Sequence, residues 1–158
     1  MGKKEYFTVS AYSHGKYLIR NPAKYTGKKT PTYRSSWEWA FMNFCDNNPA
    51  VLHWASESIN IPYFNPFNNK NTIYVPDFFI VYQDKNGKNH AEIIEIKPSG
   101  EIMETVGKSQ RNQAMAALNA IKWQAAQKWC ANNGVRFRVV TEKDLFHNPK
   151  KNSSFKVR

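Results

Sequence analysis

Residues Thr72–Lys97, TIYVPDFFIVYQDKNGKNHAEIIEIK, are typical of two β-strands joined by a tight turn, and the predicted fold is built on them. Residues 72–82 are rich in Ile, Val, Tyr and Phe, and residues 89–97 repeat this apolar, β-branched character. Between them, Asp84-Lys85-Asn86-Gly87-Lys88 is a polar turn sequence. The sequence therefore predicts a β-hairpin, whose second strand ends at Pro98-Ser99-Gly100.

The length of the turn decides which side chains share a face, because successive residues of a strand point to opposite faces. A three-residue loop, 85–87, puts Gly87 where a left-handed backbone is needed and pairs Asp84 with Lys88. The numbers of paired residues then sum to 172, which places Asp77 opposite Glu95. A two-residue Asn-Gly turn would raise the sum to 173 and would point the two carboxylates to opposite faces.

With the three-residue loop, the Cβ atoms of Asp77 and Glu95 lie about 5 Å apart. Two carboxylates at this distance repel unless one is protonated or a cation lies between them, and oxygen ligands select a hard ion such as Mg²⁺ or Mn²⁺. Lys97 follows on the same face, where it can orient or help deprotonate a water and stabilise phosphate charge. This combination suits metal-assisted hydrolysis of a phosphodiester.

A purely structural interpretation of these carboxylates competes with the metal site. Strand carboxylates are often only solvated, and Asp77 could form a cross-strand ion pair with Lys97. The apolar neighbours weigh against it, because a carboxylate among buried residues is costly without a role. Glu38 has two interpretations of equal weight: the partner of Ser35 in a capping box, or a third ligand to the metal or its water. Glu57 is expected at a surface or sheet edge.

Outside the hairpin, the chain predicts an α/β (α+β) domain. Ser35-Ser36-Trp37-Glu38 is a helix start, and Asn47-Asn48-Pro49 ends that helix. Strands are expected within 51–54, 58–64 and 135–141, a long helix over 108–133 ending at Gly134, and a short last helix from Thr141. The buried stripe of the long helix is predicted to comprise Ala114, Leu118, Ile121, Ala125 and Trp129. The order helix, three antiparallel strands, helix, strand predicts a central mixed sheet with helices on both sides.

The net charge of +11 is unevenly distributed along the 158 residues. Residues 1–34 carry +7, residues 35–105 carry −5, and residues 106–158 carry +9. Basic flanks favour a polyanion such as nucleic acid, and an acidic centre can approach phosphate only through a cation. We divide the chain into a basic arm (1–34), a core (35–147) and a basic tail (148–158) within a single domain.

Several function classes are disfavoured by the composition. No apolar stretch reaches the ~18 residues of a membrane span, and no secretory signal is recognised. The four histidines are dispersed, which disfavours a zinc site, and neither a phosphate-binding P-loop nor a GxSxG motif occurs. Cys45 and Cys130 are expected to be buried thiols.

These motifs resemble those of three known groups of proteins. Pro76-Asp77 followed by Glu95-Ile96-Lys97 resembles the PD-(D/E)XK signature of restriction-endonuclease-like nucleases. From about Tyr12 to Leu145 the chain also resembles the head-completion nucleases of T-even-type tailed phages. That likeness is carried by six segments in order: Tyr33–Glu38, Trp54–Glu57, Ile61–Phe64, Glu95–Pro98, Lys122–Ala126 and Phe137–Glu142. The same core is similar to the transposon-end endonucleases of heteromeric transposases.

The resemblance implies Mg²⁺-dependent (or Mn²⁺-dependent) cleavage of double-stranded DNA by a restriction-endonuclease-like core. Glu38, Asp77, Glu95 and Lys97 are the implied catalytic residues. Asp77, Glu95 and the Ile96 carbonyl are the implied metal ligands, joined by Glu38 in one version. Candidate DNA-binding residues are Arg34, Lys108, Arg111 and Lys122.

The implied setting is the completion of a phage head. The chain is expected to trim or cut packaged DNA ends, with portal and head proteins as partners, in the virion at the portal vertex and in the host cytoplasm during assembly. No membrane partner is expected, and a homodimer is one option. Two alternatives stay open: a virion DNA-binding protein with a vestigial site, and a transposon-end endonuclease-like subunit.

Overall fold

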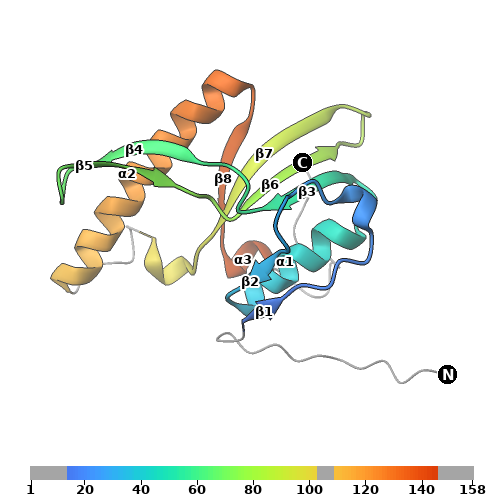
Figure 1. Ribbon diagram of the computed structural model, residues 1–158, viewed down its shortest axis with the longest axis horizontal. Helices are drawn as coiled ribbons and strands as arrows, with labels where there is room; N and C mark the ends of the chain where they lie inside the picture. The colour runs from blue at the N-terminus through green and yellow to red at the C-terminus, as the bar shows by residue number, and fades with distance from the viewer. Residues whose placement is uncertain (1–13, 103–108, 146–158) are drawn as a thin grey trace.

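A computed structural model describes residues 14–102 and 109–145 of the chain. Its centre is a four-stranded mixed sheet in the order β3-β6-β7-β8 (Figure 1). Strands β3 (Val51–Ser56), β6 (Phe78–Gln83) and β7 (Asn89–Ile96) are antiparallel, and β8 (Arg136–Val140) runs parallel to β7. Helices lie on both faces of this sheet, so the predicted fold class is confirmed.

The predicted hairpin register is confirmed in every pair of β6 and β7. Phe78 lies opposite Ile94 and Gln83 opposite Asn89, so the residue numbers of each pair sum to 172. The backbone N–H of Asp84 donates to the Lys88 carbonyl at 2.8 Å, which closes the three-residue loop. Gly87 adopts a left-handed φ of 81°, the conformation for which glycine was expected at this position.

The single strand predicted over 72–82 is wrong, because the chain divides it at Val75–Asp77. The first part is β5 (Lys70–Tyr74), which pairs with β4 (Ile61–Asn65) in a separate two-stranded sheet. Only the second part, β6, joins the central sheet. Pro76 lies at the division, and proline cannot donate a hydrogen bond to a neighbouring strand. The division leaves Asp77 at the point where the chain enters the central sheet.

Helix α1 (Ser36–Asn47) begins and ends where the sequence predicted. The Ser35 hydroxyl accepts from the Glu38 backbone N–H at 3.2 Å, as a capping residue does. The helix packs on one face of the sheet, beside the short helix α3 (Glu142–Leu145). The core on this face consists mainly of Phe41, Met42 and Cys45 from α1, and Trp54, Phe78, Ile80, Tyr82, Ile94, Ile96 and Val140 from the sheet.

Helix α2 (Gln110–Asn133) lies on the side of the sheet that carries Ile93. Ser109 caps its start, and Gly134 ends it in a left-handed conformation with φ 68°. The predicted stripe is partly wrong, since Ala114 is exposed and the buried residues of α2 are Ala116, Ala126 and Cys130. Much of the contact surface of α2 is against β4. The predicted stripe was derived without this contact. No helix in the described ranges is both long enough and apolar enough to cross a membrane.

Residues 14–34 of the predicted arm pack against the core in the described structure. They form β1 (Gly15–Lys16), the 3₁₀ turn η1 (Pro22–Lys24) and β2 (Thr32–Tyr33), with β1 and β2 paired antiparallel. Tyr17 is buried in this region. Residues 1–13 and the basic tail, 148–158, lie outside the described residues.

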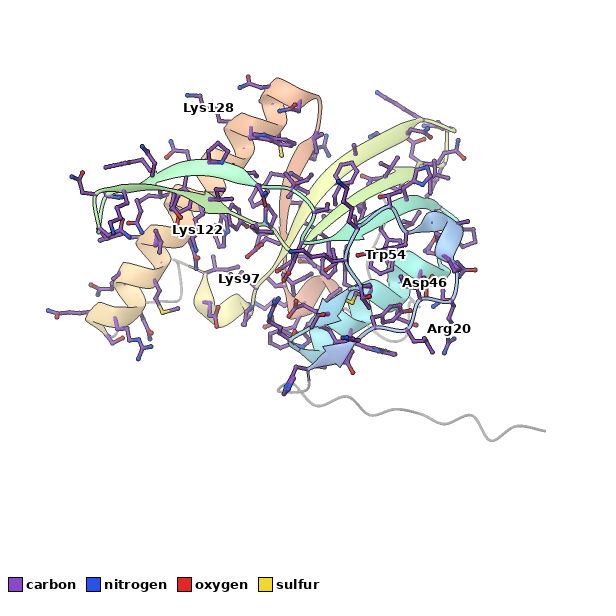
Figure 2. The ribbon with its side chains drawn as sticks, viewed as in Figure 1. Arg20, Asp46, Trp54, Lys97, Lys122 and Lys128 are labelled. Atoms are coloured by element: carbon purple, nitrogen blue, oxygen red, sulfur yellow. The ribbon has the colours of Figure 1, made fainter. Side chains whose placement is uncertain are left out.

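The Asp46 carboxylate anchors this segment to α1. It accepts hydrogen bonds from the Tyr17 hydroxyl at 2.9 Å, from the Arg20 backbone N–H at 2.8 Å and from the Asn21 backbone N–H at 2.9 Å. Burial alone would raise the pKa of Asp46, but these hydrogen bonds outweigh it and hold the pKa below its ordinary value. Asp46 and Arg20 are labelled in Figure 2.

Asp46→Asn is expected to lower the free energy of unfolding by about 2–3 kcal/mol near pH 7, since the amide leaves one buried donor without an acceptor. A carboxylate whose folded pKa is depressed stabilises the protein above its unfolded pKa of about 3.9 and loses this effect as pH falls through the folded pKa. The difference between variant and wild type should therefore shrink below pH 4. Denaturant unfolding at several pH values measures it, with exposed Asn47→Ala as the control. A constant difference at all pH values would contradict the charge argument.

Candidate active site

Asp77 and Glu95 are held together by the start of β6 and the end of β7. The Asp77 backbone N–H donates to Glu95 Oε2 at 3.3 Å. In return, Asp77 Oδ2 accepts from the Ile96 backbone N–H at 2.7 Å. Each carboxylate is thus fixed by the backbone of the opposite strand, as the three-residue turn predicted. The two hydrogen bonds occupy one oxygen of each group.

Both carboxylates carry raised pKa values. Burial is the main cause for Asp77, followed by the negative charges of Glu95 and Glu38, so that its pKa lies well above the ordinary range. Burial also raises the pKa of Glu95, against the opposing effects of Tyr74, Lys97 and Lys122. A pair of like charges in a partly desolvated position is a common feature of functional sites.

Lys97 extends from the end of β7 on the same side as Glu95. Its Nζ atom lies 3.9 Å from Glu95 Oε1 and 4.0 Å from Glu101 Oε2. Its backbone N–H donates to the Val140 carbonyl at 2.9 Å, so β8 fixes the position of this residue. The ammonium is therefore placed beside the carboxylate pair, and a quarter of the Lys97 side-chain surface is still exposed to solvent.

Glu38 serves the helix start and also lies near the site. Its Oε2 atom accepts from the Arg34 backbone N–H at 3.2 Å and lies 3.3 Å from the Ser35 hydroxyl, so the capping interpretation holds. Its negative charge also contributes to the raised pKa of Asp77. The pKa of Glu38 itself is raised by burial. The capping contacts leave the second role of Glu38, as a ligand to a metal or its water, a prediction.

Glu57 is a neighbour of the site that the sequence interpretation placed at a surface or edge. Its carboxylate forms an ion pair with the Arg34 guanidinium, and its backbone N–H donates to the Asp77 carbonyl at 2.9 Å. Its φ of 49° is left-handed, a conformation that is uncommon for residues other than glycine. No feature of the sequence indicated this unusual backbone conformation beside the carboxylate pair.

Tyr74 is a second neighbour that the sequence analysis missed. It is the buried last residue of β5, three residues before Asp77. Burial and the charge of Glu95 raise its pKa. Lys122 of α2 lies over its ring, with Nζ 5.9 Å from the ring centroid. Its closeness in sequence to Pro76-Asp77 could have indicated that Tyr74 lies near the site. Tyr74 was instead predicted to be one residue of a continuous strand.

The candidate DNA-binding residues lie in different surroundings. Lys122 lies over the Tyr74 ring, and its charge partly opposes the raised pKa of Glu95, so it belongs to the same part of the structure as Lys97. Both lysines are labelled in Figure 2. Arg34 is exposed but bound to Glu57. Arg111 is exposed in the first turn of α2, and Lys108 lies outside the described residues.

The donor chemistry of the site fits a hard divalent cation. Asp77 and Glu95 each retain a carboxylate oxygen that is not used by the interlocking backbone hydrogen bonds. Across residues 14–102 and 109–145, no three His, Cys, Asp or Glu side chains converge as a complete metal site. Mg²⁺ is commonly held by one or two carboxylates with water completing its coordination, so the pair satisfies this ion. The roles of the Ile96 carbonyl and Glu38 as ligands stay predictions.

The chain is similar in sequence to known nucleases. Residues 48–142 match the model of the family described as TnsA-like endonuclease N terminal, which spans both carboxylates, Lys97 and α2. The chain is also 36% identical to the head completion nuclease of Enterobacteria phage T4. That alignment covers 85% of this chain and 94% of the phage protein.

Proposed function

This chain belongs to the TnsA-like endonuclease family, and it is similar in sequence to the head completion nuclease of phage T4. We therefore propose that it is a metal-dependent deoxyribonuclease of phage head completion. The observation that supports this proposal best is the interlocked pair of Asp77 and Glu95 with Lys97 beside it. The reaction is hydrolysis of a phosphodiester bond, with products that carry 5′-phosphate and 3′-hydroxyl ends.

In this proposal, Asp77, Glu95 and the Ile96 carbonyl would hold Mg²⁺ or Mn²⁺, with Glu38 assisting. When bound, such an ion supplies Lewis-acid stabilisation of the phosphate charge and a more acidic water. The chain itself contributes fixed orientation, because each carboxylate is tied to the opposite strand. Lys97 orients the attacking water and offers positive charge to the phosphate oxygens as their charge grows.

The charge distribution supports double-stranded DNA as the substrate. The −5 centre, residues 35–105, contains the carboxylates, and the flanks of +7 and +9 provide phosphate contacts. We further propose that the protein acts on packaged DNA ends, that its partners are portal and head proteins, and that it is located at the portal vertex of the virion. A second copy would allow both strands to be cut, whereas a single copy would suffice for trimming.

Cleavage of linear and circular duplex DNA, with Mg²⁺ and with a chelator, tests this function. Wild type is expected to cut only when the cation is present, and Glu95→Gln is expected to cut at least about 10²-fold more slowly, since it removes one charge from the cation site. Asp84→Asn is the matched control, because this carboxylate lies at the far end of the same hairpin.

Two results would oppose the proposal. Cleavage that survives chelation would contradict metal dependence. If wild type cuts no faster than Glu95→Gln while both bind DNA equally, the enzyme function is wrong, and the alternative of a virion DNA-binding protein would gain support.

A further inference from the structure

A hollow beside the candidate active site has no role in the proposed chemistry. It lies between residues 26–29 and residues 56–60, the segment at the end of β3, and its volume is about 330 Å³. This volume is at the lower end of the range for ligand sites in proteins. Its walls are polar, with Thr26, Ser58 and Asn60 among the lining residues. The hollow therefore offers hydrogen-bond donors to a ligand of modest size.

The two walls of the hollow are held together by Tyr25. Its hydroxyl donates to the Lys29 carbonyl at 2.6 Å and accepts from the Ser56 backbone N–H at 3.4 Å, so it bridges the walls. Its ring packs edge-on against Trp54, labelled in Figure 2, with the ring centroids 4.7 Å apart. A Cβ atom at Gly27 would lie 2.5 Å from the Tyr25 hydroxyl oxygen, so only glycine allows this close approach. The walls are thus fixed by the fold, which lowers the ordering cost of binding.

The charge of the hollow favours an anion. Lys28 and Lys29 both line it, and within the described part of the chain neither ammonium group forms an ion pair or a hydrogen bond. Glu57 is the acidic residue of the lining, and its carboxylate is already paired with the Arg34 guanidinium. The lining therefore keeps an excess of two positive charges. Ammonium groups surrounded by hydroxyl and amide donors are the groups with which proteins bind phosphate.

Glu57 joins the hollow to the carboxylate pair. It lines the hollow, and its backbone N–H donates to the Asp77 carbonyl at 2.9 Å. Its left-handed φ of 49° is of the kind that persists only where the surroundings hold it, as they do at functional sites. Ser56, one residue earlier, pairs with Phe78, the neighbour of Asp77. Successive phosphates of a DNA strand are only about 3.4 Å apart along the helix axis, so a strand bound at Asp77 has another phosphate within reach of the hollow.

We propose that this hollow binds a backbone phosphate of the DNA strand beside the bond that is cut, with Lys28 and Lys29 as the cationic contacts. This inference rests on the proposed function, because it assigns a subsite for the same substrate. The occupant is a phosphodiester and not a base, since none of the residues 26–29 and 56–60 is aromatic and a base would have no ring to stack on. Such a contact places the strand over the carboxylate pair without reading its base sequence.

Replacing both lysines tests this subsite. Binding of a labelled blunt-ended duplex is measured on protein that carries Asp77→Asn, without divalent cation, so that the result does not depend on cleavage. In this background, Lys28→Ala with Lys29→Ala is expected to weaken binding about tenfold, because charge-assisted contacts to one phosphate are lost. The slope of log K against log salt concentration should become shallower by about 1, the value for one phosphate contact.

The matched control is Lys85→Ala with Lys88→Ala. This pair removes the same charge from two exposed positions at the other end of the β6–β7 hairpin, and it should change binding by less than about twofold. Equal losses in the two pairs of lysines would mean that only the total charge matters, and would overturn the subsite.

A second variant tests the hollow without changing the charge. Ser58→Phe places a ring at an exposed position of the lining and should weaken duplex binding as much as the loss of the two lysines, whereas Asn86→Phe, at the exposed hairpin turn, should not. Thermal unfolding checks that each variant is folded. A folded Ser58→Phe protein that binds DNA as its parent does would overturn the proposal. So would binding of inorganic phosphate that depends on both lysines but leaves DNA affinity unchanged, since the hollow would then hold a free anion. Absence of cleavage by wild type would refute the proposed nuclease and leave these binding results unaffected.

Discussion

Replacing Asp77 with asparagine is expected to slow DNA cleavage by about 10³-fold or more while leaving the folded protein at least as stable as wild type. The loss of activity follows from the position of the carboxylate, which shares the candidate cation site with Glu95. Removing it takes away both a ligand and a negative charge, a larger change than the loss of one hydrogen-bond donor, which itself costs about 10²–10³-fold.

The stability half of this prediction follows from the raised pKa of Asp77. Burial and the charge of Glu95 place this pKa well above its ordinary range. A raised pKa means that the folded chain accommodates the ionised group less well than the unfolded chain does, so stability falls as pH rises from the unfolded pKa of about 3.9 to the folded pKa and stays lower above it. Asparagine carries no charge, and its oxygen can still accept from the Ile96 N–H. The variant therefore avoids this cost and keeps the local hydrogen bond.

Three measurements test this prediction. Single-turnover cleavage rates report activity, duplex binding reports DNA affinity, and thermal unfolding without divalent cation reports stability. Asp144→Asn is the control, since this carboxylate is exposed and its hydrogen bonds are with Thr141 at the start of its own helix. A variant that is both inactive and strongly destabilised would indicate that Asp77 has a structural role. A variant that still cuts at a rate near wild type would remove Asp77 from the site.

The sequence could predict those features of the site whose geometry is set by residues close to one another in the chain. The turn at 85–87 sets its own register, and this register alone brings Asp77 opposite Glu95 and places Lys97 on their side. The Ser35 cap is equally local and fixes where α1 begins, and hence where Glu38 lies. In both cases a few neighbouring residues determine the geometry, so no knowledge of distant contacts is needed.

The parts that the sequence did not reveal depend on contacts between distant segments. The division of 72–82 into β5 and β6 requires β4 to be available as a separate partner for β5. The partly wrong stripe on α2 has the same cause, because much of its contact surface is against β4. Glu57 meets Asp77 only because β3 ends beside the start of β6, and its left-handed backbone has no sequence signal. Tertiary pairing therefore overrides local pattern wherever the strand is short.

Lys97→Met is expected to reduce the cleavage rate by about 10²–10³-fold, because methionine fills a similar space but carries no charge and donates no hydrogen bond. Lys97 Nζ lies 3.9 Å from Glu95, close enough to act on a water or phosphate held at the carboxylate pair. Since this interaction is proposed to strengthen in the transition state, DNA binding should change far less than the rate. Lys97→Arg should restore only part of the activity, because the guanidinium is bulkier and does not release its proton.

Glu101→Gln distinguishes a catalytic role of Lys97 from a purely electrostatic one. Glu101 Oε2 lies 4.0 Å from Lys97 Nζ, and half of the Glu101 side chain is exposed. Its removal changes the charge near Lys97 without touching the carboxylate pair, so we expect a change in rate of no more than about twofold, in line with the small value of exposed ion pairs. Single-turnover rates at saturating protein compare both variants.

If Lys97→Met weakens binding as much as it lowers the rate, Lys97 holds the DNA and is not part of the reaction. If Glu101→Gln is as damaging as Lys97→Met, the ion pair with Glu101 is what matters at this position.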